Sequence, residues 1–184
     1  MIRKATPLDI DAVAALYDEV LTDEANTGHY SNWQKGIYPT RTTAEKAIAA
    51  GTLYVLEENG VLCASVILND IQNEVYEKIP WRYPADPHEV RVIHTLCVAP
   101  SQKGRGYAGE MLLFCREQAR SEKSRVIRMD TYSGNEPAKR LYQKHGYRIA
   151  GQGHALLEGV IDEELTLLES LIDEKPTLPE LQRK

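Results

Sequence analysis

Cysteine is scarce in this chain, which has three, Cys63, Cys97 and Cys115, among 184 residues. Their number is odd, their spacing is wide, and each lies inside an apolar segment. Such a set predicts neither a disulfide framework nor a zinc site, and we expect no bound metal.

Long apolar runs are missing as well. The first residues, MIRKATPLDID, lack the apolar core of a signal peptide. No later run approaches the length of about 20 residues that crosses a bilayer. We therefore expect no membrane partner and a location in the reducing cytoplasm.

The chain also lacks an excess of positive charge. It has 22 Lys and Arg against 27 Asp and Glu, which gives a net charge of −5. A general nucleic-acid-binding domain would carry a basic face, so nucleic acid is not an expected partner. The length fits one domain with a real core, and both a monomer and a homodimer are compatible with it.

Apolar periodicity predicts strands and helices that are mixed along the chain. Strands are expected at 2–5, 52–57, 61–68, 90–98, 126–132 and 147–157. The Asn59-Gly60 pair predicts a hairpin between the second and third strands. Residues 161–172 satisfy both a strand and a helix.

Helices are expected at 7–21, 106–121 and 135–145. Thr6 and Asp9 have the spacing of a capping box at the start of the first. A further helix is expected to be capped by Thr42 or Thr43 and to end at Gly51. This order predicts one α/β domain over residues 1–172, with a mixed sheet, antiparallel N-terminal strands, helices on both faces, and a loose tail at 173–184.

A glycine-rich turn follows the strand at 90–98. Lys103, Gly104, Arg105, Gly106, Tyr107 and Ala108 lie between that strand and a predicted helix. Glycine lets the backbone approach a ligand, and the start of the helix offers unpaired N–H groups and a positive dipole end. The turn therefore indicates a phosphate site, although an ordinary strand-to-helix turn has the same elements.

The same turn also matches the dinucleotide-binding pattern G-x-G-x-x-G through Gly104, Gly106 and Gly109, with Asp130 about 20 residues further on. In that pattern the first glycine follows the strand almost at once, whereas Pro-Ser-Gln-Lys intervenes here. A hairpin also precedes this strand. Both points disfavour a nicotinamide or flavin site.

Two blocks of sequence resemble the GNAT superfamily of N-acetyltransferases. The first is the turn from Lys103 to Ala108 after Val98-Ala99-Pro100, with Lys103 where the family usually has Arg or Gln. The second is the segment NEPAKRLYQKHGY from Asn135 to Tyr147. The resemblance covers nearly the whole chain and implies acetyl-CoA as co-substrate. It further implies that the cofactor-binding residues are those of the turn together with Leu96, Cys97, Val98, Asn135, Ala138 and Arg140.

The same resemblance assigns chemical roles. Tyr142 would protonate the departing thiolate, although a core tyrosine at this helix position is the alternative. His94 lies in a segment, HTLCV, that is similar to the corresponding strand of arylalkylamine N-acetyltransferases, and it would accept the proton of the amine. Glu89 could do so instead through a water. Strand alternation predicts that Val92, His94, Leu96 and Val98 share one face.

Two irregular segments carry aromatic side chains and, by the same resemblance, would line the acceptor pocket. These candidates are His29, Trp33, Tyr38, Tyr76, Trp81 and Tyr83. We therefore expect an N-acetyltransferase that acts on a small-molecule or peptide amine. The alternatives are a non-catalytic acyl-CoA-binding regulator of the same fold and a dinucleotide-binding oxidoreductase.

Overall fold

One seven-stranded sheet forms the centre of the protein. The computed structural model describes residues 1–28 and 30–173. The strands are β1 (Ile2–Lys4), β2 (Leu53–Glu58), β3 (Val61–Asn69), β4 (Val90–Val98), β5 (Val126–Tyr132), β6 (Arg148–Leu157) and β7 (Ile161–Leu171). Their order is β1-β2-β3-β4-β5-β7-β6, with β4 and β5 parallel and the other neighbours antiparallel. The expected mixed sheet is confirmed, and the expected tail at 173–184 lies outside the described residues except for Asp173.

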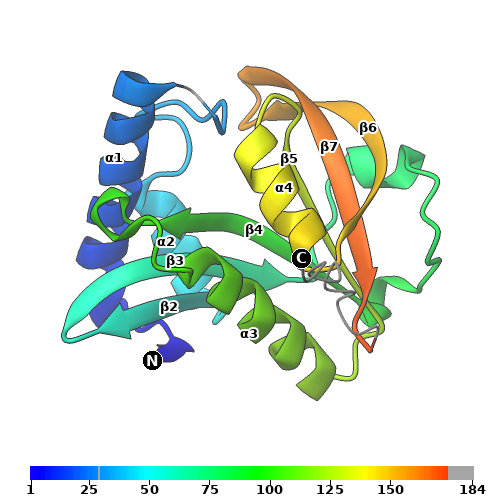
Figure 1. Cartoon of the computed structure of the whole chain (residues 1–184), viewed down its shortest axis with the longest axis horizontal. Helices are drawn as coiled ribbons and strands as arrows, with labels where there is room; N and C mark the ends of the chain where they lie inside the picture. Colours follow the sequence, from blue (N-terminus) through cyan, green and yellow to red (C-terminus); the bar gives the residue numbers. More distant parts are fainter. Residues whose placement is uncertain (29, 174–184) are drawn as a thin grey trace, which may run out of the picture.

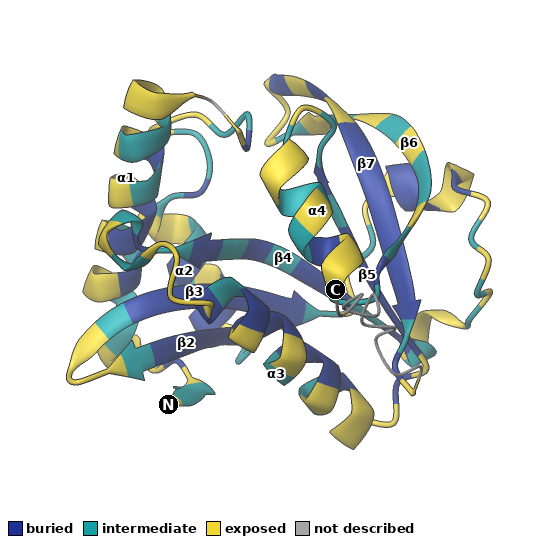
Figure 2. Cartoon of the chain, in the orientation of Figure 1, coloured by how far each residue is buried: buried dark blue, intermediate teal, exposed yellow. Residues whose placement is uncertain are grey.

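Helices cover both faces of this sheet, as expected (Figure 1). The α-helices of the described chain are α1 (Ile10–Thr27), α2 (Arg41–Ala49), α3 (Tyr107–Ser121) and α4 (Glu136–Lys144), and short 3-10 helices are η1 (Pro7–Asp9), η2 (Glu74–Lys78), η3 (Pro87–Glu89) and η4 (Pro100–Gln102). Alternation along β2 separates two cores, because Leu53 and Val55 pack with α1 and α2 while Tyr54 and Leu56 pack with α3. The helices turn their buried sides toward the sheet (Figure 2).

No helix within the two described ranges, 1–28 and 30–173, is both long and apolar enough to span a membrane.

Some element boundaries differ from the predicted ones. The first helix continues to Thr27 and not to residue 21, because its last turns are mostly exposed and therefore carry no apolar period. Thr40, not Thr42 or Thr43, caps α2, and Thr43 closes a capping box with it. Residues 161–171 form a strand and not a helix, since their backbone pairs with β5 on one side and β6 on the other.

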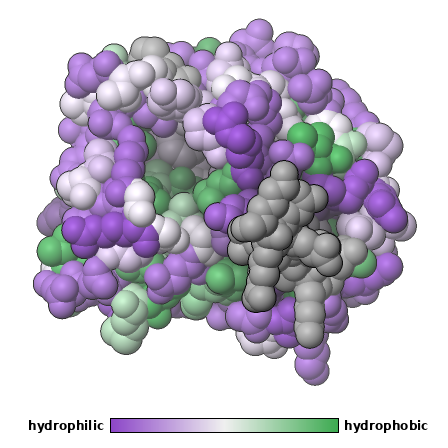
Figure 3. All heavy atoms as spheres, viewed as in Figure 1, coloured by the Kyte–Doolittle hydropathy of each residue, from purple (hydrophilic) through white to green (hydrophobic). Residues whose placement is uncertain are grey.

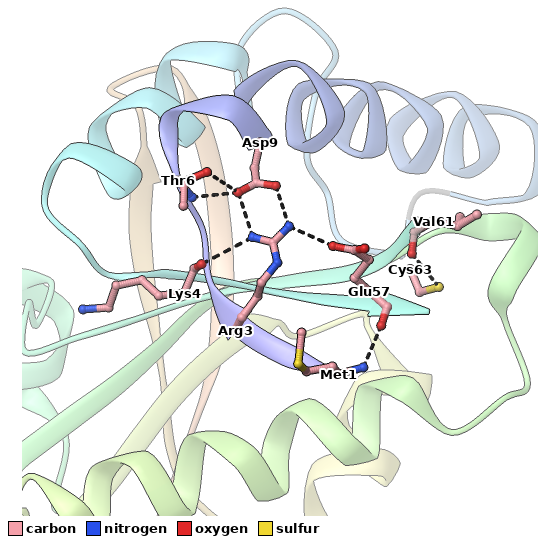
Figure 4. A network of polar contacts seen from close by, with 8 residues as sticks. All are labelled: Met1, Arg3, Lys4, Thr6, Asp9, Glu57, Val61 and Cys63. Atoms are coloured by element: carbon pink, nitrogen blue, oxygen red, sulfur yellow. Dashed lines mark hydrogen bonds and ion pairs between the residues drawn. The ribbon is translucent and has the colours of Figure 1, made fainter. Parts of the chain in front are cut away.

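An ion-pair network fastens the first strand to the rest of the domain (Figure 4). The guanidinium of Arg3 donates two hydrogen bonds of 2.8 Å to the carboxylate of Asp9 and one of 2.9 Å to Glu57 on β2. Arg3 thereby holds the pKa of Asp9 well below its usual range. Asp9 also accepts hydrogen bonds from the N–H and hydroxyl of Thr6, which confirms the predicted capping box.

A bulge in β4 separates β4 from β5. Ser65 of β3 lies opposite Cys97, whereas Ile67 lies opposite His94, so β4 has one extra residue between these two pairs. Within that stretch, Thr95 has a φ of 49°, a left-handed conformation that is unusual for a β-branched residue. The parallel pairing of β4 with β5 ends nearby, at Ile93 opposite Met129. Beyond that point the two strands diverge.

Candidate functional site

The divergence of β4 and β5 opens a cleft of about 510 Å³, called here the β4–β5 cleft. Its walls come from the second half of β4, the end of β5, the inner side of α4 and the start of α3, with α1 and the segment after it on the far side. In the space-filling view it is a hollow between α1 and α4, with apolar side chains toward its floor (Figure 3).

The bulge changes which side chains of β4 share a face, so the predicted alternation was wrong. Leu96 and Val98 pack with the core under α3, together with Ile93. His94 lies opposite Ile67, which belongs to the core under α1 and α2. One extra residue reverses the alternation. His94 and Leu96 consequently face opposite sides of the sheet, and the cleft connects these two sides.

Backbone donors line the β4 wall of the cleft. Ala99 donates its N–H to the carbonyl of Cys63 on β3 at 2.9 Å. By alternation Cys97 also directs its N–H toward β3, while Leu96 and Val98 direct theirs away from it. Because β5 pairs with β4 only as far as Ile93, the Leu96 and Val98 groups face the cleft. Of the three expected main-chain contacts, these two are therefore open to a ligand.

The glycine turn has the backbone conformation that a phosphate site requires. Gly104 and Gly106 have φ values of 82° and 86°, and a Cβ at either position would meet no atom within 4 Å. The backbone N–H groups from residue 104 to residue 109 make no hydrogen bond with any described residue, and Gly106 caps α3. Lys103 pairs with Asp23, and Arg105 lies 3.8 Å from a carboxylate oxygen of Glu58. The turn thus offers free N–H groups and two exposed cations at one end of the cleft.

The third glycine of the dinucleotide-like pattern has a packing role. A Cβ on Gly109 would lie 2.8 Å from Nε2 of His145, at the end of α4. Gly109 therefore leaves room for the imidazole of His145 beside α3. In addition, η4 separates the strand from the first glycine. The pattern G-x-G-x-x-G arises here without a dinucleotide-binding turn.

Tyr142 reaches the cleft from α4. Its side chain is 9% exposed, and its ring packs edge to face on Tyr147 at 6.4 Å. Its hydroxyl makes no hydrogen bond with any described residue, although Ala138 and Leu141 beside it also line the cleft. Burial raises the pKa of Tyr142, with smaller contributions from Asp130 and Cys97. The phenol therefore keeps its proton at neutral pH.

The other cofactor candidates of this helix have separate positions. Asn135 caps α4 by accepting a hydrogen bond of 3.2 Å from the N–H of Ala138, and both residues line the cleft. Arg140 is exposed on the outer side of α4.

His94 is held by oxygen atoms at one ring nitrogen. Nε2 lies 3.0 Å from Oδ1 of Asn69 and 3.1 Å from the carbonyl of Ile71. Oδ1 of Asn69 also accepts the N–H of Ile71, so both neighbours of Nε2 are acceptors. The neutral ring therefore carries its proton on Nε2, which leaves Nδ1 basic. Burial lowers the pKa of His94, although Asp130 opposes this shift.

Glu89 lies at the opposite end of β4 from the cleft. It belongs to η3, and its carboxylate accepts a hydrogen bond of 3.0 Å from the N–H of Asp86. It does not line the cleft. The structure brings together His94 and Tyr142 but not Glu89.

The aromatic candidates divide into two groups. Trp33 and Tyr38 line the cleft and pack edge to face, with ring centres 5.7 Å apart. Tyr76, Trp81 and Tyr83 pack in a separate core behind β5 and do not line the cleft. His29 lies outside the described residues.

The buried carboxylates of the cleft, Asp130 and Glu163, were not recognised as acceptor-site residues from the sequence. Asp130 follows the last residue of β5 that pairs with β4, and the hydroxyl of Tyr76 donates a hydrogen bond to its carboxylate at 2.7 Å. Burial raises the pKa of Asp130. Glu163 on β7 is 7% exposed, and burial, with a contribution from Asp130, raises its pKa to about 7. Within residues 1–28 and 30–173, no three His, Cys, Asp or Glu side chains gather to hold a metal.

A family model described as the Acetyltransferase (GNAT) family matches residues 15–147. That span includes the glycine turn, the diverging strands and Tyr142. The chain belongs to the GNAT family of acetyltransferases. Among curated protein sequences, none matches this chain significantly.

Solved structures show the same GNAT fold over nearly the whole chain. An acetyltransferase of the GNAT family from Streptococcus agalactiae is 25% identical, with a TM-score of 0.78 over 95% of this chain and 96% of that one. The yncA protein of Salmonella typhimurium, solved with its cofactor acetyl-CoA, is 19% identical, with a TM-score of 0.67 over 98% of each chain. A ribosomal-protein-alanine N-acetyltransferase from Brucella melitensis is 17% identical, with a TM-score of 0.68 over 93% and 99%.

The raised pKa of Glu163 predicts a pH-dependent cost to the stability of this GNAT domain. An acid that binds its proton more tightly in the folded state loses stability as the pH rises from its ordinary pKa of 4.5 to the folded value of about 7, and the full cost remains above that. Glu163→Gln removes the charge. We expect it to raise the free energy of unfolding by roughly 1 to 2 kcal/mol near pH 8, allowing for partial solvent exposure, and by less near pH 5.

Chemical denaturation of both proteins at the two pH values measures this difference. Glu164→Gln is the matched control, because Glu164 is the exposed neighbour on the same strand. An equal effect of Glu163→Gln at both pH values would show that Glu163 is not the titrating group.

Proposed function

We propose that this GNAT protein is an N-acetyltransferase that moves an acetyl group from acetyl-CoA to a primary amine by direct attack. The observation that carries the proposal is the β4–β5 cleft, which joins the glycine turn on the α3 side of the sheet to His94 and Asp130 on the other side. A cofactor that enters from one face can thus meet an acceptor that enters from the other. We expect the reaction to take place in the cytoplasm.

The residues of the turn fit the pyrophosphate of coenzyme A. Gly104 to Ala108 would donate N–H groups to the phosphate oxygens, with Lys103 and Arg105 adding charge. Leu96 and Val98 would donate theirs to the chain that links the pyrophosphate to the thioester. One of these two donors would also stabilise the negative charge that develops on the acyl oxygen.

Proton transfer would involve two side chains on opposite sides of the cleft. His94 would accept the amine proton at Nδ1, since Nε2 already carries a proton. The nitrogen then bonds to the acyl carbon as the carbon–sulfur bond breaks. Tyr142 would donate its proton to the sulfur, because its raised pKa keeps the phenol protonated until the thiolate leaves. The proton held by His94 then restores the phenol of Tyr142 through solvent, and the products are an N-acetylated amine and free coenzyme A.

The cofactor assignment predicts ligand-induced stabilisation. Coenzyme A is expected to raise the melting temperature, and NAD is not. In Gly106→Val the positive φ becomes strained and a side chain enters the space beside the turn, so affinity for coenzyme A is expected to fall about tenfold or more.

Gly60→Val is the control, because Gly60 has a similar φ of 76° and open surroundings in a hairpin outside the cleft. Calorimetry that finds equal affinity in Gly106→Val and Gly60→Val would remove the turn from the cofactor site.

Tyr142→Phe tests the proton donor. Phenylalanine preserves the packing on Tyr147, so binding of coenzyme A is expected to stay nearly intact while kcat falls by roughly two orders of magnitude. Single-turnover measurement separates chemistry from product release. An acyl donor with a more acidic thiol is expected to recover part of the rate. Normal turnover with chemistry rate-limiting would make Tyr142 a packing residue, and binding without transfer in the wild-type protein would instead indicate an acyl-CoA-binding regulator.

The lowered pKa of His94 predicts an acid limb in the pH profile of kcat/KM. The rate is expected to fall as the pH drops through the pKa of His94, below its ordinary value of about 6.5, because the protonated ring cannot accept a proton. His94→Gln is expected to lower the rate and remove that limb. The pH profiles with and without His94→Gln are compared in the Glu163→Gln background, so that the titration of Glu163 does not overlap with that of His94. A limb that persists unchanged would exclude His94 as the base.

A further inference from the structure

The acceptor side of the β4–β5 cleft has three carboxylates, whereas one carboxylate would balance the charge of a single ammonium. Asp130, Glu158 and Glu163 all line it. Among the ion pairs of the described residues, no Lys or Arg pairs with any of these three carboxylates. Lys103, at the opposite end of the cleft, is paired with Asp23. Among the described residues that line the cleft, the basic side chains are His94 and Lys103, and neither forms an ion pair with these three carboxylates.

Strand geometry separates two of these carboxylates along the cleft. Asp130 pairs with Leu167, and Glu163 lies four residues before Leu167 on the same strand. Glu163 and Leu167 therefore point to the same face, and they are on the order of 13 Å apart along β7. Asp130 shares that face, because Val126, four residues before it, belongs to the same core as Leu167. Two anionic positions thus lie along one wall.

The Tyr142 hydroxyl indicates that the position beside Asp130, and not the one beside Glu163, is where the reaction takes place. This side chain is 9% exposed, its hydroxyl makes no hydrogen bond with a described residue, and it reaches the cleft where Asp130 also lies. Asp130 and His94 influence each other's pKa, and Asp130 also contributes to the raised pKa of Tyr142. Glu163 lies further along the same wall, with Asn32 as its hydrogen-bond donor at 3.5 Å, and Asp130 contributes to the raised pKa of its carboxyl.

We propose that the acceptor is a linear diamine or polyamine, whose reacting nitrogen lies beside Asp130 and whose second ammonium is held by Glu163 with Glu158. This inference rests on the proposed function and adds the class of acceptor to it. The reacting nitrogen gives its proton to His94 and takes the acetyl group, while the second ammonium keeps its charge throughout. The positive charge of the second ammonium offsets the repulsion between the buried carboxylates of Asp130 and Glu163. An acceptor that carries a carboxylate would increase this repulsion.

Three matched series of acceptors test the proposal. They are linear diamines of four to eight carbons, monoamines of the same chain lengths, and the amino acids in which a carboxylate replaces the second amine. We expect kcat/KM for the best diamine to exceed that of the matched monoamine by about tenfold or more, and the amino acids to be the poorest. The preference is expected to weaken as salt is added.

Glu163→Gln identifies the residue that holds the second charge. We expect the preference for the diamine over its monoamine to fall about tenfold in Glu163→Gln and to remain in Glu164→Gln. Glu164 has the same side chain as Glu163 but is exposed and does not line the β4–β5 cleft. Thermal melting with coenzyme A in both variants shows that the fold and the cofactor site are intact.

The outcomes separate this inference from the function on which it rests. If monoamines or amino acids are acetylated as well as diamines, the protein is an N-acetyltransferase but the diamine assignment is wrong. An unchanged preference in Glu163→Gln would overturn the role of Glu163. If no amine of any series is acetylated although coenzyme A binds, the proposed function fails and the inference fails with it.

Discussion

The divergence of β4 from β5 is the constraint on which the rest of the site depends. In a continuous parallel pair, the N–H groups of Leu96 and Val98 would bond to β5, and no ligand could reach them. The extra residue at the bulge breaks that pairing and reverses the side-chain alternation of β4. One local irregularity therefore supplies the cleft, its backbone donors, and the separation of His94 from Leu96 onto opposite faces. Thr95, whose hydroxyl bonds to that of Tyr38, stabilises the bulge from the acceptor side.

Burial determines the protonation states around the cleft. It raises the pKa of Tyr142 and lowers that of His94, so at neutral pH one keeps a proton and the other can take one. Burial also raises the pKa values of Asp130 and Glu163, which are carboxylates without a cationic partner among the described residues. Low dielectric surroundings are costly for such groups unless a cation arrives. The acid–base assignment and the inferred acceptor charge therefore have the same physical origin.

The sequence predicted the fold well where local signals agreed with the tertiary structure. Residues 90–98 and 126–132 were predicted as strands with the boundaries that the structure has, because their apolar runs end at turn residues. Prediction from the sequence was less successful where the structure depends on contacts between residues that are far apart in the chain. The bulge at Thr95 has no signature in the chain, so His94 was placed on the wrong face relative to Leu96. Asp130 and Glu163 meet in the cleft only because β7 lies beside β5, which could not be read from residues that also satisfied a helix.

The position of β7 has a consequence for the biosynthesis of the protein. β7 lies between β5 and β6 although it follows both in the chain, so the sheet cannot be completed until residues 161–171 have left the ribosome. Until then, one edge of β5 is unpaired. Asp130 lacks its pairing partner Leu167, and Glu163 is absent from the cleft wall. The residues of the glycine turn and α3 therefore leave the ribosome well before β7 does. The proposed acceptor site is completed only when this one strand has been inserted into the sheet.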